Sequence, residues 1–186
     1  MEFLELSKRR RSIHHFTEDE VTEEEIDYIL EAARWAPSAG NAQPWRFIVV
    51  KDPENREKVW EATAGISHVS PQNFIRKAPV NIIICTDTTA YKAKQARVFS
   101  DLFCIQDSAA ATMNLLLAAA DRKLGACWVG MFREEALRDF FNIPLHVKPV
   151  AIIPIGHTQS KESPRTRKDI SELVFEETWG FMRVSH

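Results

Sequence analysis

The sequence has 186 residues and a formal net charge of −2 at pH 7. That is the length of about one domain, and the charge balance excludes general affinity for nucleic acid, which needs a basic face. With 45% hydrophobic and 27% charged residues, the composition is that of a globular protein, and we expect one domain over residues 1–186.

Cysteine and glycine usage excludes several classes of site. The three cysteines, Cys85, Cys104 and Cys127, are odd in number and widely spaced, so we expect buried reduced thiols and neither disulfides nor a metal site. The six glycines form neither a GxGxxG nor a Walker pattern. The longest apolar run, residues 115–120, is too short to span a membrane. We therefore expect a soluble, cytoplasmic protein without a membrane partner.

The first distinctive segment is "RRRSIHHF" at residues 9–16. A nucleic-acid patch, a metal site at the two histidines and a seat for a small anionic ligand are the three interpretations. The acidic run at residues 18–25 weakens the first, and adjacent histidines on an extended segment point to opposite sides, which weakens the second. A second basic cluster, "PRTRK" at residues 164–168, favours the third, because arginines pair well with phosphate oxygens.

A helix, a loop and a strand follow. Thr22 and Glu25 fit a capping box, and the apolar residues of the next three turns lie on one face, so the sequence predicts a helix that ends before Pro37. The small and amide residues of "PSAGNAQP" predict a loop over residues 37–44. The run "WRFIVV" at residues 45–50 predicts a strand covered on both faces.

The remaining pattern alternates helices with strands. Asp52 and Pro53 predict a helix start, with the end near Gly65. We expect Gly125 to end the longest helix. The other expected elements are strands at residues 80–85, 126–129 and 149–156, the long apolar helix at residues 98–123, and an amphipathic helix at residues 133–143. One α+β domain describes this order.

Five segments carry a resemblance to a known family. "RRSI", "APSAGNAQPWRFIVV", "LGACWVGMF", "PVAIIPIGH" and "RTRK" occur in the order and spacing of that family's landmarks. Over nearly the whole chain, the sequence resembles the nitroreductase family of FMN-dependent oxidoreductases. The resemblance implies a nitroreductase-like α+β fold, with a central mixed β-sheet flanked by helices and a long central helix. It also implies a homodimer that holds FMN at the subunit interface.

The resemblance assigns cofactor-binding roles to matching positions. At the FMN phosphate and ribityl chain it places Arg10, Arg11, Ser12, Arg165 and Arg167. In a loop reaching the flavin from the partner subunit it places Pro37, Ser38, Ala39 and Asn41, with Gln43 close by. Beside the isoalloxazine edge it places the backbone of Trp128, Val129 and Gly130, whose amides can bond N5 and the pyrimidine carbonyls. An amide facing the ring falls at Asn73, where the spacing is loosest.

His14 is the departure from the family pattern, which commonly has Arg or Lys as a further phosphate ligand there. A histidine carries charge conditionally, because its ordinary pKa is about 6.5. The hypothesis is that His14 attracts the phosphate at low pH and loses this attraction as the pH rises. The alternative is that His14 faces solvent. The resemblance gives His15 no role.

The implied activity is transfer of a hydride from NADH or NADPH through flavin N5 to nitroaromatic, quinone or related small-molecule acceptors, by a ping-pong mechanism. It requires no catalytic side-chain nucleophile and no metal. The alternatives are a non-catalytic FMN-binding or sensing protein, and a specialised family reaction such as dehalogenation, flavin reduction or flavin fragmentation. Because the chain is short, we expect an open and permissive pocket.

Overall fold

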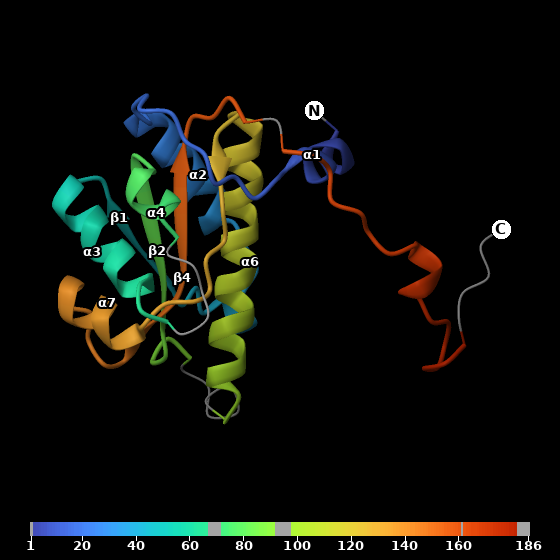
Figure 1. Cartoon of the computed structure of the whole chain (residues 1–186). Helices are drawn as coiled ribbons and strands as arrows, with labels where there is room; N and C mark the ends of the chain where they lie inside the picture. The colour runs from blue at the N-terminus through green and yellow to red at the C-terminus, as the bar shows by residue number, and fades with distance from the viewer. Residues whose placement is uncertain (1, 67–71, 92–97, 161, 182–186) are drawn as a thin grey trace.

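One four-stranded sheet organises the chain (Figure 1). The computed structural model describes residues 2–66, 72–91, 98–160 and 162–181. In spatial order the strands are β1 (Trp45–Val50), β2 (Val80–Asp87), β4 (Val147–Gly156) and β3 (Gly125–Ala126), and each neighbouring pair is antiparallel. Strand β2 is buried along almost its whole length, as its apolar sequence predicts.

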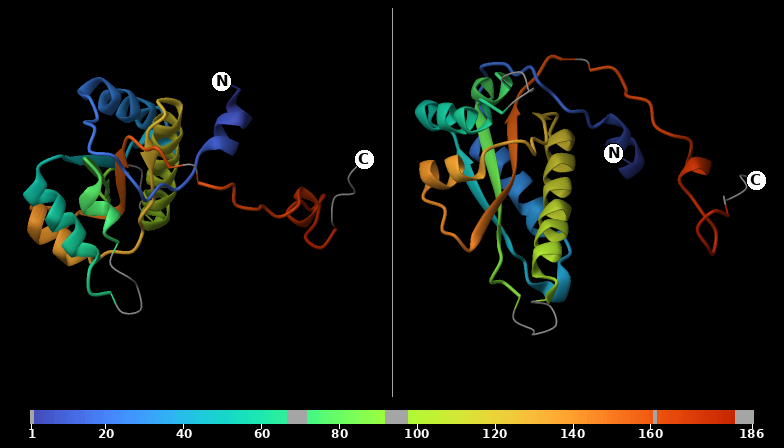
Figure 2. Two further views of the ribbon diagram at one scale, coloured as in Figure 1. Left: turned by 45° about the horizontal axis from the view of Figure 1, so that its top comes forward. Right: turned by 60° about the horizontal axis from the view of Figure 1, so that its bottom comes forward.

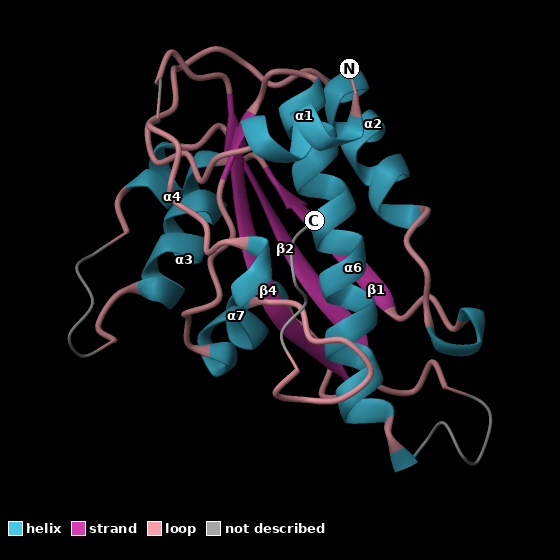
Figure 3. Cartoon of the chain, turned by 90° about the vertical axis from the view of Figure 1, so that its right-hand side faces the viewer, coloured by secondary structure: helices cyan, strands magenta, loops and turns pink. Residues whose placement is uncertain are grey.

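Helices cover both faces of the sheet, so the fold has three layers (Figures 1 and 3). Successive side chains of a strand point to opposite faces. Accordingly, Ile82 and Ile84 belong to one apolar cluster and Ile83 to another. The first cluster contains residues of α2 (Glu23–Arg34) and α6 (Ser100–Asp121); the second contains residues of α3 (Pro53–Thr63), α4 (Phe74–Lys77) and α7 (Glu134–Phe141).

Local sequence signals explain where the main helices begin. The Thr22 hydroxyl accepts a hydrogen bond from the Glu25 N–H at 3.2 Å, and the Glu25 carboxylate accepts one from the Thr22 N–H at 2.9 Å. The Asp52 carboxylate caps α3 by accepting one hydrogen bond, from the Asn55 N–H at 3.0 Å, and Pro53 follows at the first helical position. Helix α6 is long and apolar enough to cross a membrane. However, half of its apolar 18-residue stretch is buried inside this chain, as is typical of a core helix.

The structure confirms the α+β fold with its long central helix and changes three details. The paired strands are all antiparallel, and the parallel part of the expected mixed sheet is one isolated bridge between Ser12 and Ala126. The prediction that Gly125 ends the long helix is wrong: α6 ends at Asp121, Lys123 takes a left-handed φ of 62°, and Gly125 lies in β3. A short helix α1 (Phe3–Arg9) was not expected.

Both chain ends carry exposed apolar residues. After β4 the chain runs away from the sheet in both views of Figure 2, through the short helix η2 (Ile170–Glu172). This tail exposes Ile170, Leu173, Trp179 and Phe181, while α1 exposes Phe3 and Leu4. The tail therefore leaves these apolar side chains exposed, which is typical of an interaction surface.

Replacing Gly125 tests the close approach of the N-terminal segment to β3. A Cβ at position 125 would lie 2.8 Å from Cγ2 of Ile13 and 3.0 Å from Cγ2 of Thr158. We expect Gly125→Ala to lower the free energy of unfolding by about 1–3 kcal/mol, as overpacking does. Gly130→Ala is the control, because its nearest atom is 4.0 Å away. Urea denaturation measures both, and equal stability of the two variants would contradict this packing.

Candidate functional site

The N-terminal segment is held against β3. Ser12 and Ala126 form a parallel bridge, and the Ile13 N–H donates to the Ala126 carbonyl at 3.0 Å. The Ile13 side chain is buried. Thr158, just after β4, donates from its hydroxyl to the His15 carbonyl at 2.7 Å. The residues before and after Ile13 therefore lie at the edge of the sheet, where the C-terminal tail begins.

This docking creates a hollow of about 400 Å³, which we call the arginine hollow. It is lined by Arg10, Arg11, Ser12, His14, Cys127, Trp128, Glu162, Ser163, Arg165 and Arg167. The structure therefore brings together the two basic clusters that are separated by most of the chain in sequence. Among these described lining residues, four guanidinium groups outnumber the one carboxylate, that of Glu162, which makes the hollow suited to an anion such as a phosphate.

The four arginines differ in how many hydrogen bonds their guanidinium groups already donate within the chain. Within the described part of the chain, the Arg10 and Arg165 guanidinium groups make no hydrogen bond or ion pair. Arg11 donates from Nη1 to the carbonyls of Lys8 and Arg10, while its Nε is buried without an acceptor. Arg167 donates from Nη1 to two backbone carbonyls of the tail, at 3.0 and 3.2 Å. Unused donors therefore remain on all four guanidinium groups.

His14 lies beside a cysteine. Its Nε2 is 3.3 Å from Sγ of Cys127, and its ring lies 4.6 Å from the ring of Phe74, between centroids. Burial raises the pKa of the Cys127 thiol, while the Ser12 hydroxyl and the Arg10 charge act to lower it. Cys127 is thus a protonated thiol on the wall of the arginine hollow, as well as the core residue that the sequence predicts.

The segment after β3 presents two backbone donors. The amide N–H groups of Trp128 and Gly130 make no hydrogen bond within the described residues, whereas the Val129 N–H donates to the Ile152 carbonyl at 2.9 Å. In the segment that the resemblance places beside the isoalloxazine edge, the Val129 amide is thus already used by the sheet, while the amides of Trp128 and Gly130 remain available to a ligand. The Trp128 side chain is 40% exposed, so one face of this segment is open.

A second hollow of about 330 Å³ adjoins the first at His14. It is lined by His14, His15, Phe16, Asn73, Phe74 and Lys77. Asn73, the most loosely matched of the predicted site residues, thus shares a surface depression with His14. Lys77 also lines this hollow and carries no signal in the sequence. It ends the one-turn helix α4, which is too short to show a helical periodicity.

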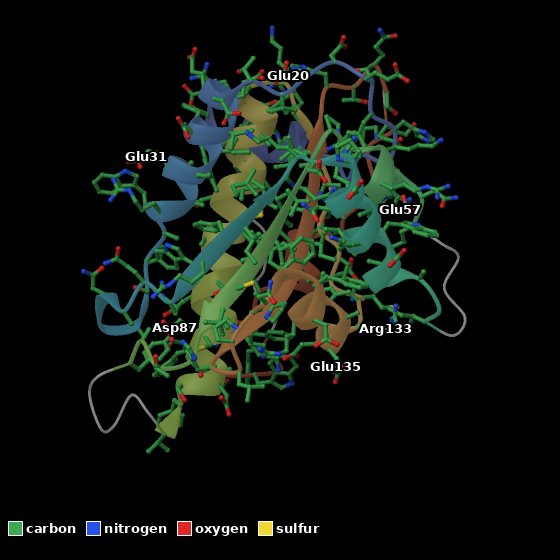
Figure 4. The ribbon with its side chains drawn as sticks, turned by 90° about the vertical axis from the view of Figure 1, so that its left-hand side faces the viewer. Glu20, Glu31, Glu57, Asp87, Arg133 and Glu135 are labelled. Atoms are coloured by element: carbon green, nitrogen blue, oxygen red, sulfur yellow. The ribbon has the colours of Figure 1, made fainter. Side chains whose placement is uncertain are left out.

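The loop at residues 37–43, which contains the helical turn η1 (Ala39–Asn41), lies at the other end of the sheet. It leads into Trp45, which pairs with Thr86 near the end of β2, whereas Val80 at the start of β2 pairs with Ile155 beside Ala126. At about 3.3 Å per residue, β2 separates this loop from the arginine hollow by about 20 Å. Figure 4 labels Asp87 at the loop end and Glu20 at the opposite end. Within one chain, the structure does not bring the two groups together.

The loop itself is held by internal hydrogen bonds. Ser38 Oγ accepts from the Gln43 N–H at 3.0 Å, and the Gln43 side chain donates to Oδ1 of Asn41 at 3.1 Å. Pro37, Asn41 and Gln43 are exposed. Gln43 therefore shapes the loop as well as lying on its surface. Among the described residues no group of three His, Cys, Asp or Glu side chains could hold a metal ion.

Comparison with known proteins identifies relatives over most of the chain. The model of the nitroreductase family matches residues 7–157. A protein of Methanothermobacter thermautotrophicus named "Putative NADH dehydrogenase/NAD(P)H nitroreductase" is 41% identical, over 90% of this chain and 82% of its own length. The crystal structure of a nitroreductase family protein from Clostridium difficile 630 superposes with a TM-score of 0.79 at 28% identity, covering 96% of this chain and 99% of that chain.

More distant relatives have several different names. An "FMN reductase [NAD(P)H]" of Bacillus subtilis is 28% identical over 91% of this chain and 71% of its own length. A 5,6-dimethylbenzimidazole synthase of Rhodospirillum rubrum is 27% identical over 88% of this chain and 82% of its own length. These names belong to proteins with different reactions, so similarity alone does not select one substrate.

The thiol of Cys127 provides a test of the hollow's electrostatics. Because the pKa of Cys127 is raised, we expect iodoacetamide to alkylate it slowly at neutral pH. The alkylation rate should still be increasing at pH values above about 8.5, where an ordinary thiol is mostly ionised. Arg10→Ala removes a charge that lowers this pKa, so it should slow the reaction further, whereas Arg9→Ala should not. Peptide mass spectrometry distinguishes Cys127 from Cys85, whose burial raises its pKa to about 12. Fast labelling of Cys127 at neutral pH would contradict the assignment.

Proposed function

The chain belongs to the nitroreductase family, and we propose that it is an FMN-dependent oxidoreductase that uses NADH or NADPH to reduce small-molecule acceptors. The observation that carries the proposal is the meeting of the two arginine clusters in one hollow. The names of relatives, among them NAD(P)H nitroreductase and FMN reductase, supply the cofactor class.

The residues of the arginine hollow fit the phosphate end of FMN. The buried Arg11 Nε has no acceptor, and the guanidinium groups of Arg10 and Arg165 have no partner among the described residues. A phosphate would supply acceptors to the Arg10 and Arg165 guanidinium groups, with Ser12, Arg167 and Nη2 of Arg11 as further donors. Charge-assisted hydrogen bonds of this kind stabilise a complex by about 1.5–3 kcal/mol each.

The ring end of the cofactor would extend toward Trp128 and the second hollow. The amides of Trp128 and Gly130 are the donors that this segment has to offer, and Asn73 and Lys77 line the adjoining depression with His14. A cation such as Lys77 favours negative charge developing on a nearby ring. We propose that His14, between the two hollows, contacts the cofactor as well.

A homodimer completes the site in this proposal. The loop at residues 37–43 lies about 20 Å from the arginine hollow of its own chain, so in this proposal it acts on the hollow of another copy. Leu102, Ile105 and Met113 form an exposed apolar stripe on α6, and the tail exposes further apolar side chains. These surfaces fit a second copy of the chain related by a two-fold axis.

The chemistry that bound FMN supplies is hydride transfer from NAD(P)H to an acceptor in two half-reactions, consistent with a ping-pong mechanism. The protein's residues position and polarise the cofactor. The arginines would hold the anionic end, the two free amides and Lys77 would be donors to polar atoms of the ring, and the 40% exposed Trp128 would leave one side open for donor and acceptor in turn. No side-chain nucleophile is required.

The proposed acceptors are nitroaromatic compounds and quinones. The partly exposed Trp128 beside the arginine hollow leaves the site open, which supports a permissive enzyme over a specialised one. We also propose that residues 1–186 act as a single domain, and that the protein works in the cytoplasm, where its three buried thiols would stay reduced.

Substitution of the arginines tests the phosphate site. Arg10→Ala and Arg165→Ala should each weaken FMN binding about tenfold to a hundredfold, because each removes a charged donor. Arg9→Ala is the matched control from the same run of arginines, since Arg9 donates to the Ala120 carbonyl at 2.7 Å and does not line the arginine hollow. Quenching of FMN fluorescence measures the affinities. Equal losses in all three variants would contradict the assignment.

A direct assay tests the activity. We expect the purified protein to be yellow, to lose its visible absorbance on anaerobic addition of NADH or NADPH, and to regain it with a nitroarene or a quinone. Colour that survives the donor would support a non-catalytic FMN-binding protein instead. Recovery with free flavin alone would identify a flavin reductase, and a protein that added FMN cannot colour would overturn the proposal.

A further inference from the structure

A buried carboxylate anchors the loop at residues 37–43 to the central helix. Asp107, on α6, is 8% exposed. Its Oδ2 accepts a hydrogen bond from the Ala39 N–H at 3.0 Å and another from the Tyr91 hydroxyl at 2.8 Å. Asp107 lies near the loop end of α6, far from Ala120 and the arginine hollow. The proposed chemistry therefore gives it no direct role.

The loop needs such an anchor because its backbone is strained. Gly40, Asn41 and Gln43 have φ values of 58°, 55° and 49°. The left-handed region suits glycine and is tolerated by asparagine, but it is unfavourable for Gln43, which keeps this shape only when surrounding contacts enforce it. The internal bonds of the loop fix its curvature, and the Ala39–Asp107 bond fixes its position on α6.

The anchor is costly to bury and is well matched to its donors. A carboxylate removed from water is destabilising unless hydrogen bonds replace its hydration. Asp107 has no ion pair among the described residues, so the Ala39 N–H and the Tyr91 hydroxyl supply that compensation. Burial and the hydrogen bond to Asp107 raise the pKa of Tyr91, so its hydroxyl stays protonated and able to donate well above neutral pH.

We propose that Asp107 and Tyr91 are positioning residues for the cofactor site of the partner subunit. By holding the Ala39 amide, they set the loop at residues 37–43 in the conformation with which it contacts the cofactor in the arginine hollow of the other chain. The inference rests on the proposed function, because it needs FMN between two subunits. It adds that FMN binding at the surface of one subunit requires two buried residues, Asp107 and Tyr91, in the core of the other.

Substitutions at the anchor test the requirement. Asp107→Ala removes the acceptor and should weaken FMN binding about tenfold or more. Asp107→Asn retains an oxygen that can accept the Ala39 N–H and should restore part of the affinity, while Tyr91→Phe should have a smaller effect. Ser108→Ala is the matched control: Ser108 is buried next along the same helix, and its Oγ has no hydrogen-bond partner.

Fluorescence titration with FMN measures the affinity of each variant, and analytical sedimentation checks that each variant is still a dimer. If Asp107→Ala does not fold, Asp107→Asn and Tyr91→Phe carry the test. Variants at position 107 that bind FMN as tightly as the parent would overturn the proposal. A parent protein that binds no FMN would instead overturn the proposed function, so the two failures are distinguishable.

Mixed dimers test whether the anchor acts on the partner's site. Asp107→Ala subunits keep a good arginine hollow, and Arg165→Ala subunits keep a good loop. In a mixed dimer, one site combines the two intact parts and the other combines both defects. Random re-pairing should therefore restore FMN binding and turnover at about a quarter of all sites. If the loop served its own chain, every site would keep one defect and the mixture would show no recovery.

Discussion

The bridge between Ser12 and Ala126 is the contact on which the candidate site depends. It lays the N-terminal segment along β3 and leaves Arg10 and Arg11 opposite the arginines of the tail. Gathering four guanidinium groups is repulsive, so something must hold the segment in place when no anion is bound. Burial of the Ile13 side chain is worth about 1.5–3 kcal/mol on a typical scale, and Gly125 provides the space for it. A small apolar contact thus supports a charged site that would not assemble on charge alone.

Much of the fold could be predicted from local signals, because they act within a few residues. The capping box of α2, the Asp-Pro start of α3 and the apolar runs of β1, β2 and β4 lie where the sequence indicates. The errors concern features set by distant contacts. Gly125 resembles a helix terminator in sequence, yet its hydrogen is needed because Ile13 packs against it from the other end of the chain. Helices α1 and α4 are too short for periodicity to identify them.

The candidate site, too, could be predicted only in part from the sequence. Its basic residues could be named from the sequence, because clustered arginines and a family resemblance both point to a phosphate. Their meeting in one hollow, the use of the Val129 amide by β4 and the contact between His14 and Cys127 are tertiary facts. Lys77 and Asp107 carried no recognisable signal. An isolated lysine after a loop and an acid within an apolar helix are each common. Their possible roles become visible only from the residues that they contact in the folded chain.

The two ends of the sheet meet different physical requirements. Recognition of a phosphate by charge acts over several ångströms and tolerates long, exposed side chains, so the arginine hollow can lie at the edge of the molecule. Recognition through a loop backbone acts only at contact distance and needs a loop fixed in place, which explains why the loop at residues 37–43 is tied to a buried carboxylate on α6. Because β2 keeps these two devices about 20 Å apart in one chain, only a pair of chains brings them to one cofactor in the proposed assembly. Cofactor binding and dimer association are then linked, and each stabilises the other.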